Sequence, residues 1–91
     1  MSVVAYTQFR VADFAAWEAA YKGSSAVREM GHVRRSTAYR VSGDPQAVVV
    51  INEFDDRGAA DAFYASRELS EARSRGGVDE TTFSVTYLEE V

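Results

Sequence analysis

The segment AVVVINEF, residues 47–54, carries five consecutive apolar residues before Asn52, Glu53 and Phe54. A strand with one face in water alternates apolar and polar residues, because successive side chains point to opposite faces. This segment does not alternate until its end, so the pattern predicts a strand that is buried on both faces. Runs of β-branched and aromatic residues predict three more strands, over Val3–Val11, Val33–Val41 and Thr81–Glu89.

Two stretches have the spacing of a helix with one apolar stripe. Asp13 is a suitable N-cap for the first, which ends near Met30 and Gly31 and has its apolar positions at Phe14, Trp17, Ala20, Tyr21 and Val27. Asp55 or Asp56 caps the second, which is broken or kinked around Ser66 and stopped by Gly76-Gly77; its apolar positions are Ala59, Ala62, Phe63 and Leu69. The turn residues Ser42-Gly43-Asp44-Pro45 predict a hairpin between the second and third strands.

The resulting order βαββαβ predicts an α+β, ferredoxin-like fold formed as a single domain by residues 1–91. Its four-stranded antiparallel sheet has two helices on one face only. The other face would expose members of Val48–Ile51, parts of Val3–Val11, and Phe83, Val85 and Tyr87. A monomer seldom leaves so large an apolar patch in water. We therefore expect a homodimer in which two sheets pack face to face.

Charge and composition exclude several classes of function. The net charge is −4, which gives no field to hold nucleic acid or an anionic membrane. The local cluster of Arg34, Arg35 and Arg40 has two interpretations, a solvated strand edge, which we favour, or an anion site. Cysteine is absent, which fits a reducing cytoplasm. The N-terminus lacks the features of a signal peptide. The chain has one histidine and no cysteine, so a zinc site would have to be built from carboxylates and His32, which is a poor ligand set for zinc. No metal site is therefore predicted.

Three segments of the chain resemble the dimeric α/β-barrel superfamily: RVADFAAWEAAY, INEFDDRGAADAFYASRELSEA and the closing GV and FSVTYLEEV. Within it they are most similar to short bacterial cyclase-like and antibiotic-biosynthesis-monooxygenase-like proteins. The resemblance covers nearly the whole chain. It implies a dimeric α/β barrel with an apolar pocket in each protomer, and a reaction on an aromatic or polyketide-like small molecule.

The chain differs from the family that it resembles at the positions where the family's active residues lie. Phe54 stands where many members have a pocket Trp, Val50 where the monooxygenases have an Asn, and Ala60 where they have a Tyr. Asn52 is two residues away from the Asn position. In haem-degrading relatives a helix His ligates iron; here that position is Arg73, whose guanidinium stays protonated, and their helix Trp is Phe63. Haem degradation and a bound cofactor are therefore not expected.

Polar groups in an apolar pocket are the remaining candidates for a site. Asn52 and Phe54 share one face of their strand, and the Asn52 amide either pairs across the dimer or binds a ligand. His32 is either a loop residue or a base at the pocket mouth. The strand Val3–Val11 offers the face of Tyr6 or the face of Thr7, and the sequence does not choose between them. The pocket candidates are Asn52, Phe54, Phe63, Tyr64, Arg73, Tyr39, Tyr87, Tyr6 and His32.

Two classes of function stay open at this point. One is a cofactor-independent monooxygenase or a cyclase, in which the protein encloses the substrate and stabilises its enolate or phenolate. The other is a non-catalytic dimer that binds a small apolar ligand or serves in a stress response. The catalytic residues are not identified by the sequence.

Overall fold

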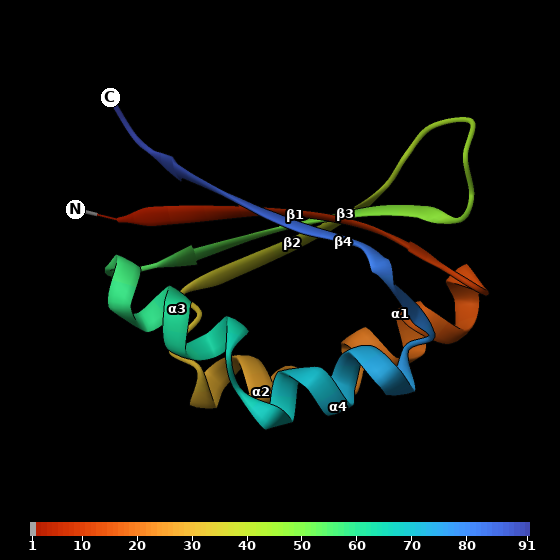
Figure 1. The fold of residues 1–91 in the computed structure, drawn as a ribbon, viewed down its shortest axis with the longest axis horizontal. Helices are drawn as coiled ribbons and strands as arrows, with labels where there is room; N and C mark the ends of the chain where they lie inside the picture. The colour runs from red at the N-terminus through yellow and green to blue at the C-terminus, as the bar shows by residue number, and fades with distance from the viewer. Residues whose placement is uncertain (1) are drawn as a thin grey trace.

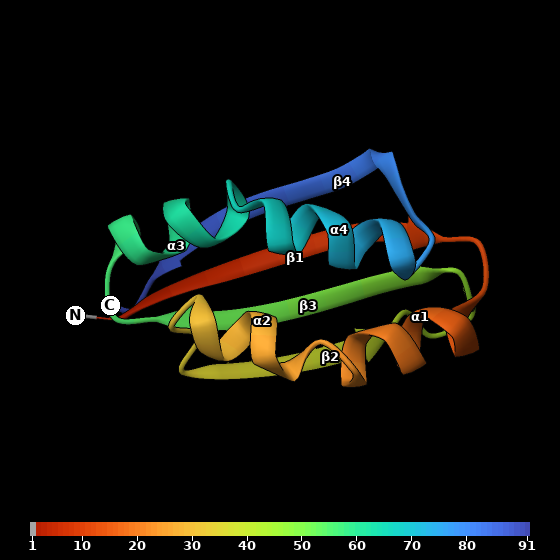
Figure 2. The same cartoon turned by 90° about the horizontal axis from the view of Figure 1, so that it is seen from below.

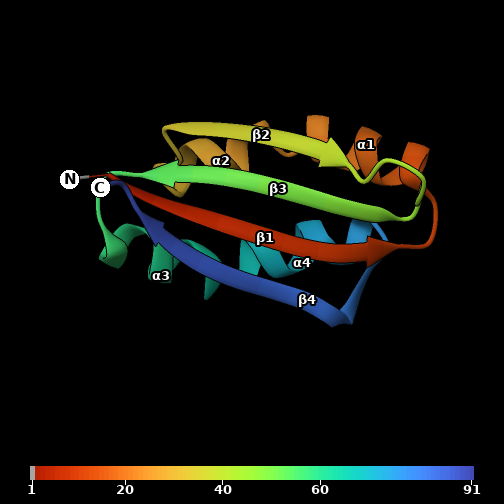
Figure 3. The same ribbon diagram turned by 90° about the horizontal axis from the view of Figure 1, so that it is seen from above.

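A computed structural model describes residues 2–91 of the chain. One antiparallel sheet has the strand order β2-β3-β1-β4, as Figure 3 shows from its uncovered side. The strands are β1 (Val3–Val11), β2 (Arg35–Arg40), β3 (Ala47–Phe54) and β4 (Val78–Glu89). The hairpin of β2 and β3 was predicted and is confirmed, with Ser36 opposite Asn52 in its register.

All the helices of residues 2–91 lie on one face of this sheet (Figure 1). They are α1 (Phe14–Lys22), α2 (Ser25–Met30), α3 (Arg57–Tyr64) and α4 (Arg67–Arg75). The ferredoxin-like α+β fold predicted from the order of elements is confirmed, while the dimer stays a prediction. No helix within residues 2–91 combines the length and the apolar character needed to cross a membrane.

Each of the two expected helices is divided into two short ones. The break at Ser66 was predicted: its hydroxyl accepts a hydrogen bond from the Leu69 backbone N–H at 3.2 Å and so caps α4. The first helix was expected to run unbroken to Met30, and this was wrong. It breaks at Gly23-Ser24, where the Ser24 hydroxyl donates to the Ala20 carbonyl at 2.7 Å. Such back-bonding competes with a regular helical backbone.

The ends of the elements follow local hydrogen bonds. Asp56, rather than Asp55, caps α3 by accepting from the Ala59 N–H at 2.8 Å. β4 begins at Val78, three residues earlier than predicted, because Val78 pairs with Val11 across a shift in register between Gln8 and Arg10. β2 is shorter than predicted at both ends. Gly77, with φ +69°, follows α4 as expected.

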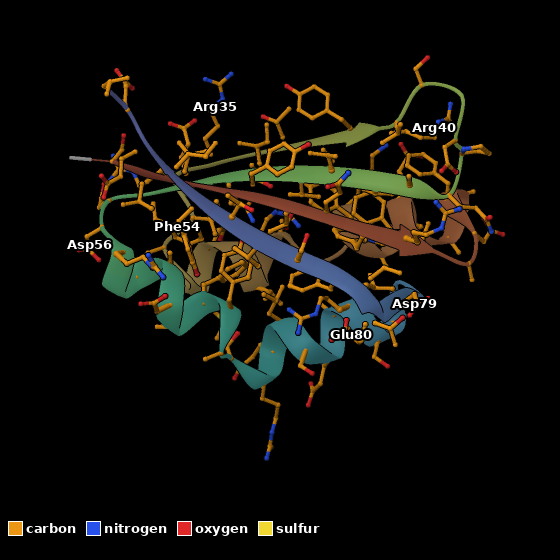
Figure 4. All side chains as sticks on the ribbon, turned by 45° about the horizontal axis from the view of Figure 1, so that its top comes forward. Arg35, Arg40, Phe54, Asp56, Asp79 and Glu80 are labelled. Carbon is orange, nitrogen blue, oxygen red and sulfur yellow. The ribbon has the colours of Figure 1, made fainter. Side chains whose placement is uncertain are left out.

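The third strand, β3, divides its apolar side chains between the two faces of the sheet. Val48, Val50, Asn52 and Phe54 are buried and share a face with Ala5, which contacts Phe54 and Phe63 in the core beneath the helices. Val49 and Ile51 point to the uncovered face. Figure 4 shows the same division, with Phe54 between sheet and helices and Arg35 pointing away from the helices.

Part of the expected uncovered face was assigned wrongly. Phe83, Val85 and Tyr87 pack against the core beneath the helices. Val85 and Tyr87 do so because they pair in register with Thr7 and Ala5 on the buried face of β1. The apolar and aromatic side chains of the uncovered face are instead Val4, Tyr6, Tyr39, Val49, Ile51 and Leu88, which we call the open-face patch. Arg35 pairs with Glu53 at its border, and Arg34 pairs with Asp55, as expected for a solvated strand edge.

Candidate functional site

A cavity lies between the sheet and the helices, with walls from both. Figure 2 looks onto the helices, where α1 and α2 run along β2 and β3 while α3 and α4 run along β1 and β4. The volume open to the centres of water molecules is about 70 Å³. At ~10–15 Å³ of such volume for each water, about five waters fit, or roughly the volume of a one- or two-ring aromatic molecule.

Aromatic rings make up much of the cavity wall. Trp17 stacks on Tyr21 with ring centroids 5.0 Å apart, and Phe9 lies 5.7 Å from Trp17 and 5.8 Å from Phe83. Their faces suit a flat aromatic ligand, since aromatic rings attract one another at such centroid distances. The lining residues are Thr7, Phe9, Trp17, Ala20, Tyr21, Ser24, Val27, Arg28, Val50, Asn52, Phe63, Tyr64, Leu69, Ala72, Arg73, Val78 and Phe83.

Asn52 and Tyr64 form a polar pair in this apolar wall. The Asn52 amide Nδ2 donates a hydrogen bond to the Tyr64 hydroxyl at 3.0 Å. Asn52 is 5% exposed, and its Oδ1 has no hydrogen-bond partner within residues 2–91. Tyr64 ends α3 and is held by rings on three sides: Phe54, Phe63 and Tyr87. Because the pair belongs to one chain and lies under the helices, Asn52 does not pair across the uncovered face.

The Tyr64 phenol keeps its proton in this environment. Burial raises its pKa to about 12, while the hydrogen bond from Asn52 and the charge of Arg73 act in the opposite direction. At neutral pH Tyr64 is therefore a hydrogen-bond donor whose acceptor position is already used by Asn52. The pair presents one O–H donor and one free amide oxygen to the cavity.

Arg73 brings a positive charge to the same wall. Its Nε donates to the Glu80 carboxylate at 3.1 and 3.2 Å, and its guanidinium carbon lies 4.3 Å from the centre of the Phe83 ring. The Nη1 atom is buried and has no partner within residues 2–91. Glu80 lies at the start of β4 (Figure 4).

The structure brings together only some of the residues predicted for the site. Asn52, Phe63, Tyr64 and Arg73 line the cavity. Phe54 is fully buried behind Tyr64. Tyr87 makes an edge contact with the ring of Tyr64, and Arg57 lies over the Tyr87 ring. Phe54 and Tyr87 support the site without lining it.

Three predicted residues lie elsewhere. Tyr6 and Tyr39 are on the uncovered face, because Thr7, Phe9 and Val11 are the β1 residues that face the helices. His32, with φ +59°, lines a separate pocket beside α2 and α3 that includes Gly31 and Ser66. Within residues 2–91 no group of three His, Cys, Asp or Glu side chains is placed to hold a metal ion.

Sequence reasoning missed several lining residues from the first helix. Trp17 and Tyr21 were assigned to the apolar stripe of the helix, and Arg28 was not among the pocket candidates. The break at Gly23-Ser24 reorients the second half of the stretch and brings Arg28 over the Tyr21 ring at 4.1 Å. The signal available was the run Gly-Ser-Ser in the middle of a predicted helix.

Comparison with known proteins supports the fold. No protein-family model and no curated protein matches the chain. A solved structure of a candidate antibiotic biosynthesis monooxygenase from Bordetella bronchiseptica matches with a TM-score of 0.85 and 14% identity, covering 99% of this chain and 97% of that one. SnoaB, a cofactor-independent oxygenase from Streptomyces nogalater, matches with a TM-score of 0.72 and 16% identity, over 96% and 88% of the two chains.

A third similar structure is described by a different family name. An ethyl tert-butyl ether D family protein from Bacillus halodurans matches with a TM-score of 0.69 and 15% identity, over 100% of both chains. The fold is that of the antibiotic biosynthesis monooxygenase-like proteins. At these identities the likeness concerns the fold, and the chemistry has to be argued from the site.

Proposed function

We propose that this protein binds a one- or two-ring aromatic molecule in the cavity and oxidises it with molecular oxygen, without a bound cofactor. The observation that carries the proposal is the Asn52–Tyr64 pair, a neutral phenol donor and an unpaired amide oxygen set in an aromatic wall. The fold shared with a cofactor-independent oxygenase supports it.

The proposed chemistry is the conversion of a phenolic ring into a quinone. The phenol loses its O–H proton to water, and the resulting anion reduces oxygen. One oxygen atom enters the ring as a carbonyl, and the other leaves as water with the two hydrogens that the ring loses. Tyr64 donates a hydrogen bond to the substrate oxygen on which negative charge develops, and the charge of Arg73 favours the same anion. The rings of Trp17 and Phe83 hold the substrate flat.

Oxygen uptake with 1,5-dihydroxynaphthalene, which has a C–H group para to each hydroxyl, tests this proposal. We expect one oxygen consumed for each quinone formed, with kcat/KM reduced ~10²-fold in Tyr64→Phe. Tyr39→Phe is the matched control, since it removes the same hydroxyl from the uncovered face. Uptake that is equal in both variants would contradict the proposal.

A non-catalytic ligand-binding protein is the second candidate. It is favoured by the composition of the cavity wall, where no carboxylate or imidazole among residues 2–91 is placed to act as a general base. Saturable binding of the dihydroxynaphthalene without oxygen uptake would establish this function instead. A cyclase would use the same pair to hold an enolate, and would rearrange its substrate without consuming oxygen.

The assembly proposed with this function is a homodimer formed through the open-face patch. The patch lies on a sheet face that no helix covers, and Tyr39 and Leu88 in it are 53% and 46% exposed. A stable two-fold interface there would bury about 1,200–2,000 Å² in total. The cytoplasmic location expected from the sequence stays a prediction.

A further inference from the structure

The charged side chains that line the cavity all carry the same sign. Arg28 and Arg73 are the charged residues in the lining set, and both are cations. Glu80 contacts Arg73 from outside the cavity, with a side chain that is 56% exposed. An exposed carboxylate is screened by water and compensates a buried charge poorly. An empty cavity of this kind therefore favours an anionic guest over a neutral one of the same shape.

Arg73 has a donor position that its neighbours leave free. Glu80 takes Nε through both of its oxygens, whereas the buried Nη1 has no partner within residues 2–91. Leaving a buried charged donor unpaired costs free energy that an arriving acceptor would recover. The side chain of Arg73 is only 16% exposed, so the burial is a feature of the whole group and not of one atom.

The second buried atom that lacks a partner within residues 2–91 belongs to the Asn52–Tyr64 pair, whose tyrosine ring lies near Phe83. Phe83 is in contact with the Arg73 guanidinium and lies 6.5 Å, centre to centre, from the ring of Tyr64, which carries the hydrogen bond to Asn52. Asn52 Oδ1 is also buried without a partner. A ligand ring resting against Phe83 would thus meet a cationic N–H on one side, and a phenol O–H with an amide oxygen on the other.

We infer that the cavity selects aromatic acids, with Arg73 Nη1 binding a carboxylate oxygen of the ligand and the Tyr64–Asn52 pair binding a hydroxyl group on the same ring system. A carboxylate is ionised at neutral pH, whereas a simple phenol is not. The free charge of Arg73 therefore distinguishes the two. This inference rests on the proposed function and specifies its substrate class.

The experiment compares 1-naphthoate with 1-naphthamide, its neutral counterpart of the same shape, by calorimetric titration of the full chain at neutral pH. Charge-assisted hydrogen bonds are roughly twice as strong as neutral ones, so we expect naphthoate to bind ~10- to 100-fold more tightly. In Arg73→Gln this preference should fall to within about threefold, mainly because naphthoate binds more weakly. Arg75→Gln removes the same charge from an exposed position on α4 and should keep the preference.

Each outcome separates the inference from the proposed function. If naphthamide binds and naphthoate binds no better, the inference is overturned while the aromatic site stands. If neither compound binds while the dihydroxynaphthalene does, the inference alone is overturned; if none of the three binds, both are overturned. A preference retained in Arg73→Gln would also overturn the role of Arg73. Should Arg73→Gln fail to fold, the wild-type preference and Arg73→Lys, expected to keep a reduced preference because it keeps the charge, decide the matter.

Discussion

The two faces of the sheet are built from the same strands but differ in what they do with their apolar residues. On the helix side, Val48, Val50 and Phe54 are buried and close a core around the cavity. On the other side, Val49 and Ile51 meet no helix within residues 2–91, and Ile51 is only partly buried. The unbroken apolar run of β3 is thus the sum of two requirements, packing beneath the helices and association through the open-face patch.

The polar groups of the two faces differ in whether they have partners. On the uncovered face, charged side chains are exposed and form ion pairs, as Arg10 does with Asp44 at 2.7 Å and Arg35 with Glu53. On the helix side, two buried polar atoms, Asn52 Oδ1 on β3 and Arg73 Nη1 on α4, have no partner within residues 2–91. Buried polar atoms are rarely left unpaired without a reason. This contrast is why the proposed chemistry is assigned to one face and the proposed assembly to the other.

The largest expected effect comes from removing a ring on the helix side. Phe54→Ala should lower the free energy of unfolding by about 3–5 kcal/mol, because Phe54 is fully buried against Phe63 and Tyr64. Urea unfolding measures this. Tyr39→Ala removes a ring from the open-face patch, and its smaller cost should vary with protein concentration, as expected for a dimer contact. Equal and concentration-independent losses would contradict the division between faces.

High pH should weaken the helix side through Tyr64. Its pKa in the folded protein is about 12, above the ordinary value of 10.0, so the unfolded chain loses the proton first as pH rises. The contribution of Tyr64 is fully present below pH 10 and declines between pH 10 and 12, by about 2–3 kcal/mol. Unfolding curves of the wild type and Tyr64→Phe over this range should converge as pH rises. Parallel curves would show that Tyr64 is not desolvated.

Replacing Asn52 should affect binding more than folding. Asn52→Leu removes the donor to Tyr64 but also removes the unpaired Oδ1, so the two contributions oppose each other. We expect the free energy of unfolding to change by less than about 1 kcal/mol while the affinity for a hydroxyaromatic ligand falls ~10-fold. Thermal melts and ligand titrations on the same variant measure both. A large loss of stability with unchanged affinity would make Asn52 a structural residue only.

The smallest effect on the folded chain itself is expected from a charge in the open-face patch. Ile51→Asp should leave the stability of the monomer within about 1 kcal/mol, because the side chain is already partly in water. It should nevertheless dissociate the dimer in sedimentation experiments, because an interface would bury the new carboxylate without a partner. Ser70→Asp adds the same charge on exposed α4 and should stay dimeric. A wild type that sediments as a monomer at micromolar concentration would contradict the proposed assembly.

The fold was predictable because its signals are local. The alternation of Thr81–Glu89, the cap at Asp56 and the stop at Gly76 each depend on a few neighbouring residues. The break at Gly23-Ser24 was missed because apolar residues keep a helical spacing across it. Val50 shows a similar limit: the apolar run did not say which face of the sheet it lies on, and register places it in the cavity wall.

The site was predictable only in part, since it depends on contacts between distant elements. Period-2 alternation correctly grouped Asn52 with Phe54, but it does not say which face the helices cover, and so Tyr6 and Tyr39 were included. Tyr64 was found by residue type alone, and Arg73 by its match to the iron-ligating His position of the family that the chain resembles. Their partners, Asn52 and Glu80, follow from how α3 and α4 cross the sheet, which no local pattern specifies.

The division of the first helix has a consequence for local opening of the folded chain. α2 has six residues and no buried side chain, yet Val27 separates the inner cavity from the pocket beside His32. Helices this short are marginal without tertiary contacts. Local opening of α2 therefore costs less than opening any strand, and its backbone amides should exchange with deuterium before those of β1 or β3. If the cavity takes the proposed ligand, we expect the bound ligand to slow the exchange of the α2 amides, since Val27 of α2 lines the cavity.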